Sequence, residues 1–150
     1  MIQRKQTLFL LLAVILGVIT MSTPIATVGD EGLTLQRVYC IMAMDAQGGA
    51  SFQVWPLFLL MLLASSISVI DIFLFRQRMV QAKICMVSVI LFMAFYVGLA
   101  VFSKLLAPDA LNFHPTLSAA LPAVSAILCV MARKGIIADE KLVRAADRIR

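Results

Sequence analysis

Four long apolar stretches, separated by polar segments, dominate the chain. A bilayer core of about 30 Å takes roughly 20 helical residues per crossing. Stretches that meet this length lie at about residues 7–24, 55–75, 84–103 and 115–132. The pattern predicts an all-α membrane protein, a four-transmembrane-helix bundle that forms one domain over residues 1–150.

The composition supports this interpretation. Hydrophobic residues make up 62 % of the chain and charged residues 14 %, against about 45–50 % and about 25 % in soluble domains. A soluble chain of 150 residues could not bury so much apolar surface in one core. We therefore expect the lipid bilayer to cover it.

The first apolar stretch has a second interpretation. Arg4 and Lys5 precede it, and a basic start before an apolar run is also typical of a signal peptide. However, Thr23, Pro24 and Ile25 follow the run without an A-x-A cleavage pattern. We expect an uncleaved first helix, with a signal peptide as the alternative.

Basic residues are distributed unevenly between the two sides of the predicted bundle. One side carries only Arg37 and Lys104. The other carries eleven basic residues: Arg4, Lys5, Arg76, Arg78, Lys83, Arg133, Lys134, Lys141, Arg144, Arg148 and Arg150. Because Lys and Arg are enriched on the cytoplasmic side of membrane proteins, the sequence predicts cytoplasmic N- and C-termini.

The first outer loop, residues 25–54, is the only sizeable segment predicted on the outer side. Bulky and β-branched residues fill Leu33–Met44, a turn signal follows at Asp45–Gly49, and alternation resumes at Ser51–Trp55. Two apolar runs around a Gly-rich turn are typical of a hairpin. We expect a small β-hairpin on the outer mouth of the bundle; an irregular loop is the alternative.

Two prolines mark the fourth predicted helix. Pro115 suits its first turn. Pro122 would lie inside it and should kink it, with the freed carbonyl bonded by Ser118, Ser125 or a neighbouring helix.

A cytoplasmic amphipathic C-terminal helix is expected over residues 138–150. Gly135 is placed to cap the fourth helix, and Asp139 to begin the next one. Glu140 and Arg144 are spaced for an i,i+4 ion pair.

Small and polar residues mark the predicted helix contacts. Ala13 and Gly17 form a small-xxx-small pair, as do Ala94 with Gly98 and Ala119 with Ala123. Ser65, Ser66 and Ser68 could add hydrogen bonds between helices. Such pairs serve packing inside the bundle or contact with a partner.

Asp71 is the only ionisable residue within a predicted span, and such residues are functional candidates by default. Arg76 follows it by five residues, with Arg78 and Lys83 beyond. We expect Asp71 and Arg76 to form an intramembrane polar site, either as an interfacial ion pair or as a cap on a neighbouring helix. A proton or cation relay is the alternative.

No catalytic, cofactor or metal site is predicted. Cys40, Cys85 and Cys129 lack CxxC or Cys/His spacing, and His114 stands alone. No Ser/His/Asp set or nucleotide loop is visible. The basic residues adjoin apolar segments without interleaved exposed aromatics, which argues against nucleic-acid binding.

Three segments carry a family resemblance. They are the opening Met1–Leu8, the segment Phe75–Lys83 and the closing Asp139–Arg150. The chain resembles a family of small bacterial membrane proteins catalogued as domain of unknown function number 4293. The resemblance implies four helices in a bacterial inner membrane and assigns no activity.

All three segments lie on the predicted cytoplasmic side, where the positive-inside pattern requires basic residues but no glutamine or aspartate. We therefore expect a docking surface there, with the tail helix lying across the bases of the other helices. Its candidate residues are Gln3, Arg4, Gln81, Lys83, Asp139, Glu140, Lys141, Arg144, Asp147 and Arg148. The alternative is that these residues only tie the tail to the bundle.

The sparse site chemistry favours a non-catalytic accessory or structural subunit that binds a larger membrane complex, either another membrane protein or further copies of this chain. One alternative is a small transporter or channel that uses Asp71. Another is a sensor with a ligand site near Arg37, Tyr39 and Trp55. A membrane enzyme acting on a lipid or quinone-like substrate would need more convergent polar groups than the sequence supplies.

Overall fold

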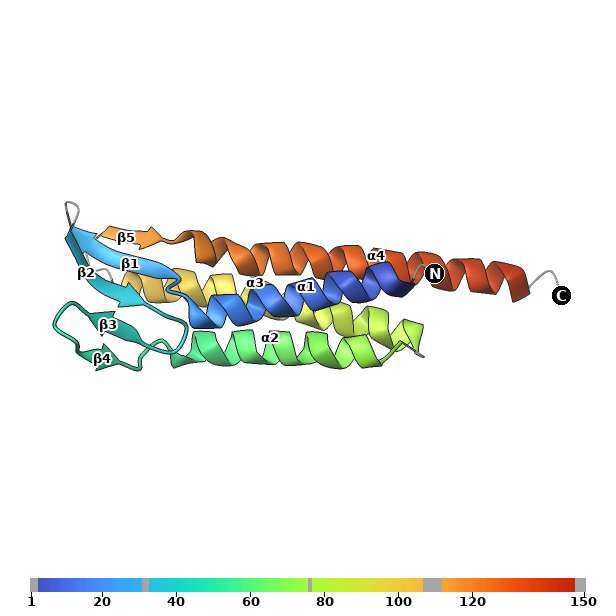
Figure 1. Cartoon of the computed structure of the whole chain (residues 1–150), viewed down its shortest axis with the longest axis horizontal. Coiled ribbons are helices and arrows are strands. Elements are labelled where there is room, and N and C mark those ends of the chain that lie inside the picture. Colours follow the sequence, from blue (N-terminus) through green and yellow to red (C-terminus); the bar gives the residue numbers. More distant parts are fainter. Residues whose placement is uncertain (1–2, 31–32, 76, 107–111, 148–150) are drawn as a thin grey trace.

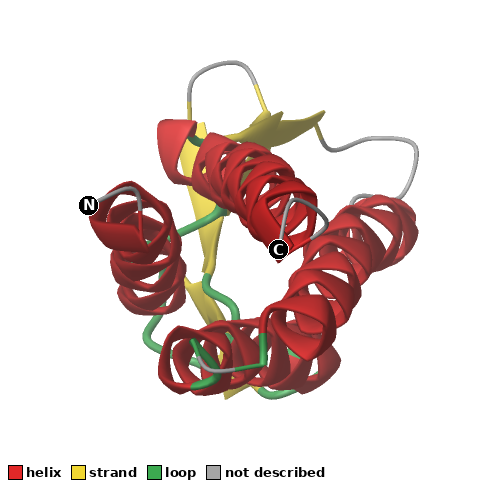
Figure 2. Cartoon of the chain, turned by 90° about the vertical axis from the view of Figure 1, so that its right-hand side faces the viewer, coloured by secondary structure: helices red, strands yellow, loops and turns green. Residues whose placement is uncertain are grey.

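The computed structural model describes residues 3–30, 33–75, 77–106 and 112–147, and four long helices make up most of it. The helices are α1 (Gln3–Ser22), α2 (Trp55–Phe73), α3 (Arg78–Leu106) and α4 (Leu121–Asp147). Each packs against two neighbours in the ring order α1, α2, α3, α4. Figure 2 shows the four helices end-on, with the strands at the far end.

Three of the described helical segments are long and apolar enough to cross a membrane: Trp55–Phe73, Arg78–Leu106 and Leu117–Ala145. The first apolar helix is shorter, at Gln6–Ser22. The boundaries of α2 follow the predicted span closely, whereas α3 extends well beyond the predicted residues 84–103 at both ends.

The bundle carries apolar side chains on its outside and polar ones inside. Exposed apolar residues include Leu8, Leu11, Ile15, Val18, Leu59, Leu62, Ile70, Met86, Ile90, Met93, Val97, Val101, Ile127 and Met131. The buried polar residues are Gln6, Thr20, Ser65, Ser68, Asp71, Gln81, Ser88 and Ser125. This distribution is the reverse of that in a soluble bundle.

Glycine allows close approach between helices at two predicted contact positions. A Cβ at Gly17 of α1 would overlap the hydroxyl of Ser65 on α2. A Cβ at Gly98 of α3 would lie 2.8 Å from Cδ2 of Leu57 on α2. Both predicted small residues therefore serve packing within the chain.

The segments that connect α1 to α2 and α3 to α4 form a five-stranded sheet, where the sequence predicted only a hairpin. The strands are β1 (Ala26–Asp30), β2 (Leu33–Val38), β3 (Ala43–Asp45), β4 (Ala50–Ser51) and β5 (Asn112–Pro115). Their order is β4-β3-β2-β1-β5, and each pair is antiparallel. The predicted turn is confirmed, because β3 and β4 meet around Gly48, which has φ +85°.

Two features of the sheet were missed. The apolar run Leu33–Met44 is broken between β2 and β3 by a turn in which Tyr39 N–H donates to Met42 O at 2.8 Å. Strand β5 comes from the short second outer loop and pairs with β1. Its sequence Asn112–Pro115 is too short and polar to signal a strand, so only pairing with β1 defines it.

Helix α4 begins differently from the prediction. Pro115 ends β5, and a 3-10 turn, η1 (Leu117–Ala120), leads into the helix. Pro122 therefore lies in the first turn of α4, where a missing N–H is tolerated, and not in its interior. The hydroxyl of Tyr96 on α3 donates to Ala119 O at 2.7 Å and accepts from Ala123 N–H at 2.8 Å. Tyr96 thus bonds backbone groups at the start of α4 from a neighbouring helix, which was one of the expected sources.

The C-terminal end also differs, because α4 runs without a break through Gly135 to Asp147. The predicted cap at Gly135 and the separate tail helix from residue 138 are therefore wrong. Gly135 does not have the positive φ that a left-handed cap requires; instead it packs against Gln6. Figure 1 shows α4 continuing straight past the other helices, so the tail does not lie across their bases.

Candidate functional site

Asp71 lies at the centre of a buried polar contact between α2 and α3. Its side chain is 0 % exposed, and its Oδ2 accepts from the thiol of Cys85 at 2.8 Å. Its main-chain oxygen accepts from Gln81 Nε2 at 3.0 Å. Gln81 and Cys85 are four residues apart, so both point from one face of α3 toward α2.

The predicted ion pair is absent from the described residues. Asp71 Oδ1 is buried and has no hydrogen-bond partner among them. Neither the half-buried Arg78 nor the exposed Lys83 pairs with Asp71. Arg76 lies outside the described residues, so the pair predicted with it stays a prediction. Asp71 contacts the neighbouring helix through a thiol and a glutamine side chain, and not as the cap that the other interpretation required.

Two further polar residues share the Asp71 face of α2. Ser68 donates to Ala64 O at 2.9 Å within its own helix. Ser65 Oγ is buried and unpaired within the described part of the chain. Ser68 also contacts the thiol of Cys129 on α4, as the prediction of bonds between helices required. A further bond between helices comes from Ser125 on α4, which donates to Ala13 O of α1 at 3.2 Å.

All three cysteines are buried as free thiols. Cys40 lies outside the helices, in the turn after β2, and burial raises the pKa of its thiol to about 12. A thiol that stays protonated is unreactive at neutral pH. Across the described residues, no three His, Cys, Asp or Glu side chains come together in a way that could hold a metal ion.

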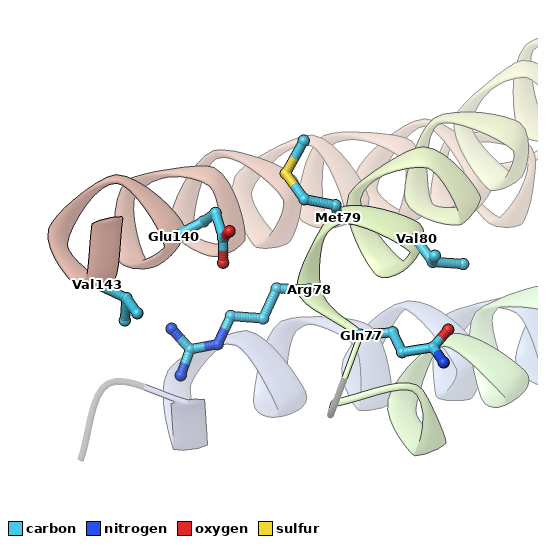
Figure 3. A pocket seen from close by; sticks show the side chains of 6 residues that line it. All are labelled: Gln77, Arg78, Met79, Val80, Glu140 and Val143. Atoms are coloured by element: carbon cyan, nitrogen blue, oxygen red, sulfur yellow. The ribbon is translucent and has the colours of Figure 1, made fainter. Parts of the chain in front are cut away.

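A groove of about 300 Å³ lies between the start of α3 and the last turns of α4. We call this part of the molecule, where α1 begins and α4 ends, the terminal end, and the opposite part the sheet end. The groove is lined by Gln77, Arg78, Met79, Val80, Glu140 and Val143. In Figure 3 the side chain of Arg78 extends from α3 toward Glu140 and Val143 of α4.

The residues predicted for docking divide into two sets. Four make contacts within the chain: Gln81 with Asp71, Asp139 with Gln6 Nε2 at 2.7 Å, and Glu140 with Arg144 at 3.0 Å. The last pair confirms the i,i+4 prediction. Only the contact of Asp139 with Gln6 joins α4 to another helix, as the alternative in which these residues tie the tail to the bundle requires.

The second set makes no contact that the described residues show. Lys83 and Lys141 are exposed. Gln3, Arg4 and Asp147 belong to α1 and α4, but their side chains are outside the described part, as is all of Arg148.

Sequence reasoning missed Cys85 as the partner of Asp71, and it missed the apolar lining of the groove. The spacing of Gln81 and Cys85 on one helical face was the available signal for the first. Nothing local indicated that Met79 and Val80 would face Val143, because more than 60 residues separate them.

A family model described as "Domain of unknown function (DUF4293)" matches residues 2–149. No curated protein matches the chain.

Proposed function

The chain belongs to the DUF4293 family, and we propose that it is an integral protein of a bacterial inner membrane that serves as a non-catalytic accessory subunit. In this proposal four helices cross the bilayer, both termini lie in the cytoplasm, and the terminal end docks to a larger membrane complex. The observation that carries the docking role is the exposed basic and apolar surface on α3 and α4 at that end.

The membrane assignment is supported by the outward-facing apolar side chains of all four helices. Leu11 on α1, Ile70 on α2, Val97 on α3 and Ile127 on α4 are all exposed. Surfaces of this kind are stable in lipid and promote aggregation in water. Three of the helices meet the length and hydropathy of a span.

The fourth span in this proposal is α1. Its apolar part, Gln6–Ser22, is at the short end of the roughly 17–25 residues that cross a bilayer core. It packs along both α2 and α4, so it shares their environment. The pairing of β1 with β5 ties the chain after α1 to the chain before α4, at the same end of the bundle.

The orientation is supported by the distribution of charge. Arg37 and Lys104 belong to the sheet end, on β2 and at the end of α3. Arg78, Lys83, Lys134, Lys141 and Arg144 belong to the terminal end, on α3 and α4. The positive-inside rule then assigns the terminal end to the cytoplasm.

The docking role can be tested by affinity purification from native membranes in mild detergent. The intact chain is compared with one truncated after Glu140, which keeps the buried Ile136 and the Gln6–Asp139 contact. We expect a stoichiometric partner with the intact chain and its loss with the truncated one. An intact chain that purifies alone would overturn the accessory role.

A second function is favoured by one observation. The buried, unpartnered Oδ1 of Asp71 could take up a proton or a cation in a small transporter. Ion flux into proteoliposomes would then be abolished by Asp71→Asn and retained in Ser88→Ala, which alters another buried polar residue. Equal flux in the wild type and Asp71→Asn would exclude a transport role for this carboxyl.

A further inference from the structure

The groove at the terminal end combines an apolar lining with unpaired basic charge. Met79 and Val80 of α3 and Val143 of α4 line it and are exposed, and Leu142 beside it is 63 % exposed. Exposed apolar residues gathered at one place mark an interaction surface more often than isolated ones do. A ligand that buries this surface would have to contact both α3 and α4.

We propose that the groove binds an amphipathic helix of a partner protein, with an apolar stripe flanked by acidic residues. The proposal rests on the accessory role and specifies the chemistry of the partner. An apolar stripe would cover Met79, Val80 and Val143, in the way that a helix lies in a hydrophobic groove. Its acidic flanks would face the basic side chains around the groove.

Charge complementarity supports an acidic partner. Four basic residues belong to this end: the half-buried Arg78 and the exposed Lys83, Lys134 and Lys141. Within the described ranges none of them forms an ion pair. The two nearby acids are already engaged, Asp139 with Gln6 and Glu140 with Arg144. The charge left for a partner is therefore positive, which steers association toward acidic surfaces.

Membrane lipid is a poorer occupant because of the position of Val143 along α4. Val143 follows Arg133 by ten residues, or about 15 Å of helix. The headgroup layer is only about 5–7 Å thick on each side. If Arg133 lies near the edge of the hydrocarbon core, Leu142 and Val143 extend past the headgroups, where acyl chains do not reach them.

A second copy of this chain is disfavoured by its charge. The segments of the terminal end carry eleven basic residues against three acids, Asp139, Glu140 and Asp147. A symmetric dimer through the groove would bring two basic surfaces together, and like charges in contact are destabilising. A different protein with an acidic helix avoids this cost.

The test is site-specific photo-crosslinking in native membranes. A benzophenone amino acid replaces Met79 or Val143 in the groove, and Ile90 or Val97 on the lipid-facing side of α3. Adducts are mapped by mass spectrometry. The groove positions are then combined with Arg78→Glu or with Arg37→Glu, a matched reversal of an exposed charge at the sheet end. Arg78 is half-buried and forms no ion pair among the described residues, so its substitution should leave the fold intact, which size-exclusion chromatography checks.

We expect Met79 and Val143 to crosslink to an acidic segment with apolar residues at helical spacing. Arg78→Glu should lower the yield about fivefold, and Arg37→Glu should not. Adducts with lipid, with a second copy of this chain, or with a segment that lacks acidic residues would overturn the proposal, as would a yield insensitive to Arg78→Glu.

The positions on α3 separate this proposal from the function on which it rests. Protein adducts only at Ile90 or Val97 would mean that docking uses the lipid-facing helices, so the accessory role would survive and the groove proposal would fail. No protein adduct at any position would overturn both.

Discussion

The two ends of the bundle are completed in different ways. At the sheet end, residues of the sheet and its connections bury Ile25, Val28, Val38 and Cys40 almost completely. Thr116 N–H donates to Ile25 O at 2.9 Å, which joins the chain before α4 to the end of α1. At the terminal end α4 extends past its neighbours, and Val143 and Leu142 stay exposed.

The difference suggests that the sheet end contributes more to stability and that the terminal end contributes more to binding a partner. Backbone and side-chain groups of the sheet end bond to each other, so a substitution there removes a buried partner. At the terminal end the internal contact of Gln6 with Asp139 uses neither Arg78, Met79 nor Val143 of the groove. Substitutions in the groove should therefore affect binding more than folding.

The largest expected effect is at the close contact between α1 and α2. Gly17→Ala places a methyl group against Ser65 Oγ and should cost about 2–3 kcal/mol of unfolding free energy through overpacking. Detergent-induced unfolding monitored by circular dichroism measures it. Adding Ser65→Ala removes the overlapping hydroxyl and should restore most of the loss. A double variant as unstable as Gly17→Ala alone would contradict this account.

The next largest loss of stability is expected at Tyr96, whose hydroxyl joins α3 to the start of α4. Tyr96→Phe leaves Ala119 O and Ala123 N–H without their shared hydroxyl. Unpaired buried backbone groups should lower the unfolding free energy by about 2 kcal/mol, measured in the same assay. Phe102→Leu, which alters another partly buried aromatic side chain of α3 without removing a hydrogen bond, is the control. Stability equal to the wild type would show that these groups find other partners.

A smaller loss is expected at the terminal end from Asp139→Ala. The change removes the acceptor of Gln6 Nε2, a side chain that is 7 % exposed. We expect a loss of about 1 kcal/mol. If Asp139→Ala costs more than Tyr96→Phe, the sheet end is not the more stable half. Gln6→Ala should cost a similar amount, and the two changes together should cost less than their sum.

The smallest effect is expected from Arg144→Ala. Its partner Glu140 is on the surface of α4, and Arg144 itself is 67 % exposed. Pairs of this kind contribute about 0.3–0.5 kcal/mol in helices, so the unfolding free energy should barely change. The variant frees Glu140 beside the groove, and partner recovery should fall although stability does not. Unchanged recovery would count against binding through charge at this end.

Several features followed from the sequence alone. The boundaries of α2, the turn at Gly48 and the pair of Glu140 with Arg144 were predicted correctly. Each depends on residues that are neighbours along the chain, since hydropathy, turn preference and i,i+4 spacing are local properties. The family resemblance was also confirmed by the match over residues 2–149.

Other features depended on contacts that no local pattern shows. Gly135 was interpreted as a helix end because glycine often has that role, yet here it makes room for Gln6 of α1. For Asp71 the sequence pointed only to nearby cations, and it did not show that α3 brings Cys85 and Gln81 to this residue. Strand β5 exists only because β1 pairs with it.

By itself the sequence determined how much apolar length the chain carries and on which side its basic residues gather, because both are sums over consecutive residues. The tertiary structure decided which polar side chains form hydrogen bonds inside the bundle and which remain exposed for contacts with other molecules. That outcome depends on how α1, α3 and α4 are aligned, and the alignment is set by packing between residues far apart in the chain. The groove between Arg78 and Val143 is one result of that packing.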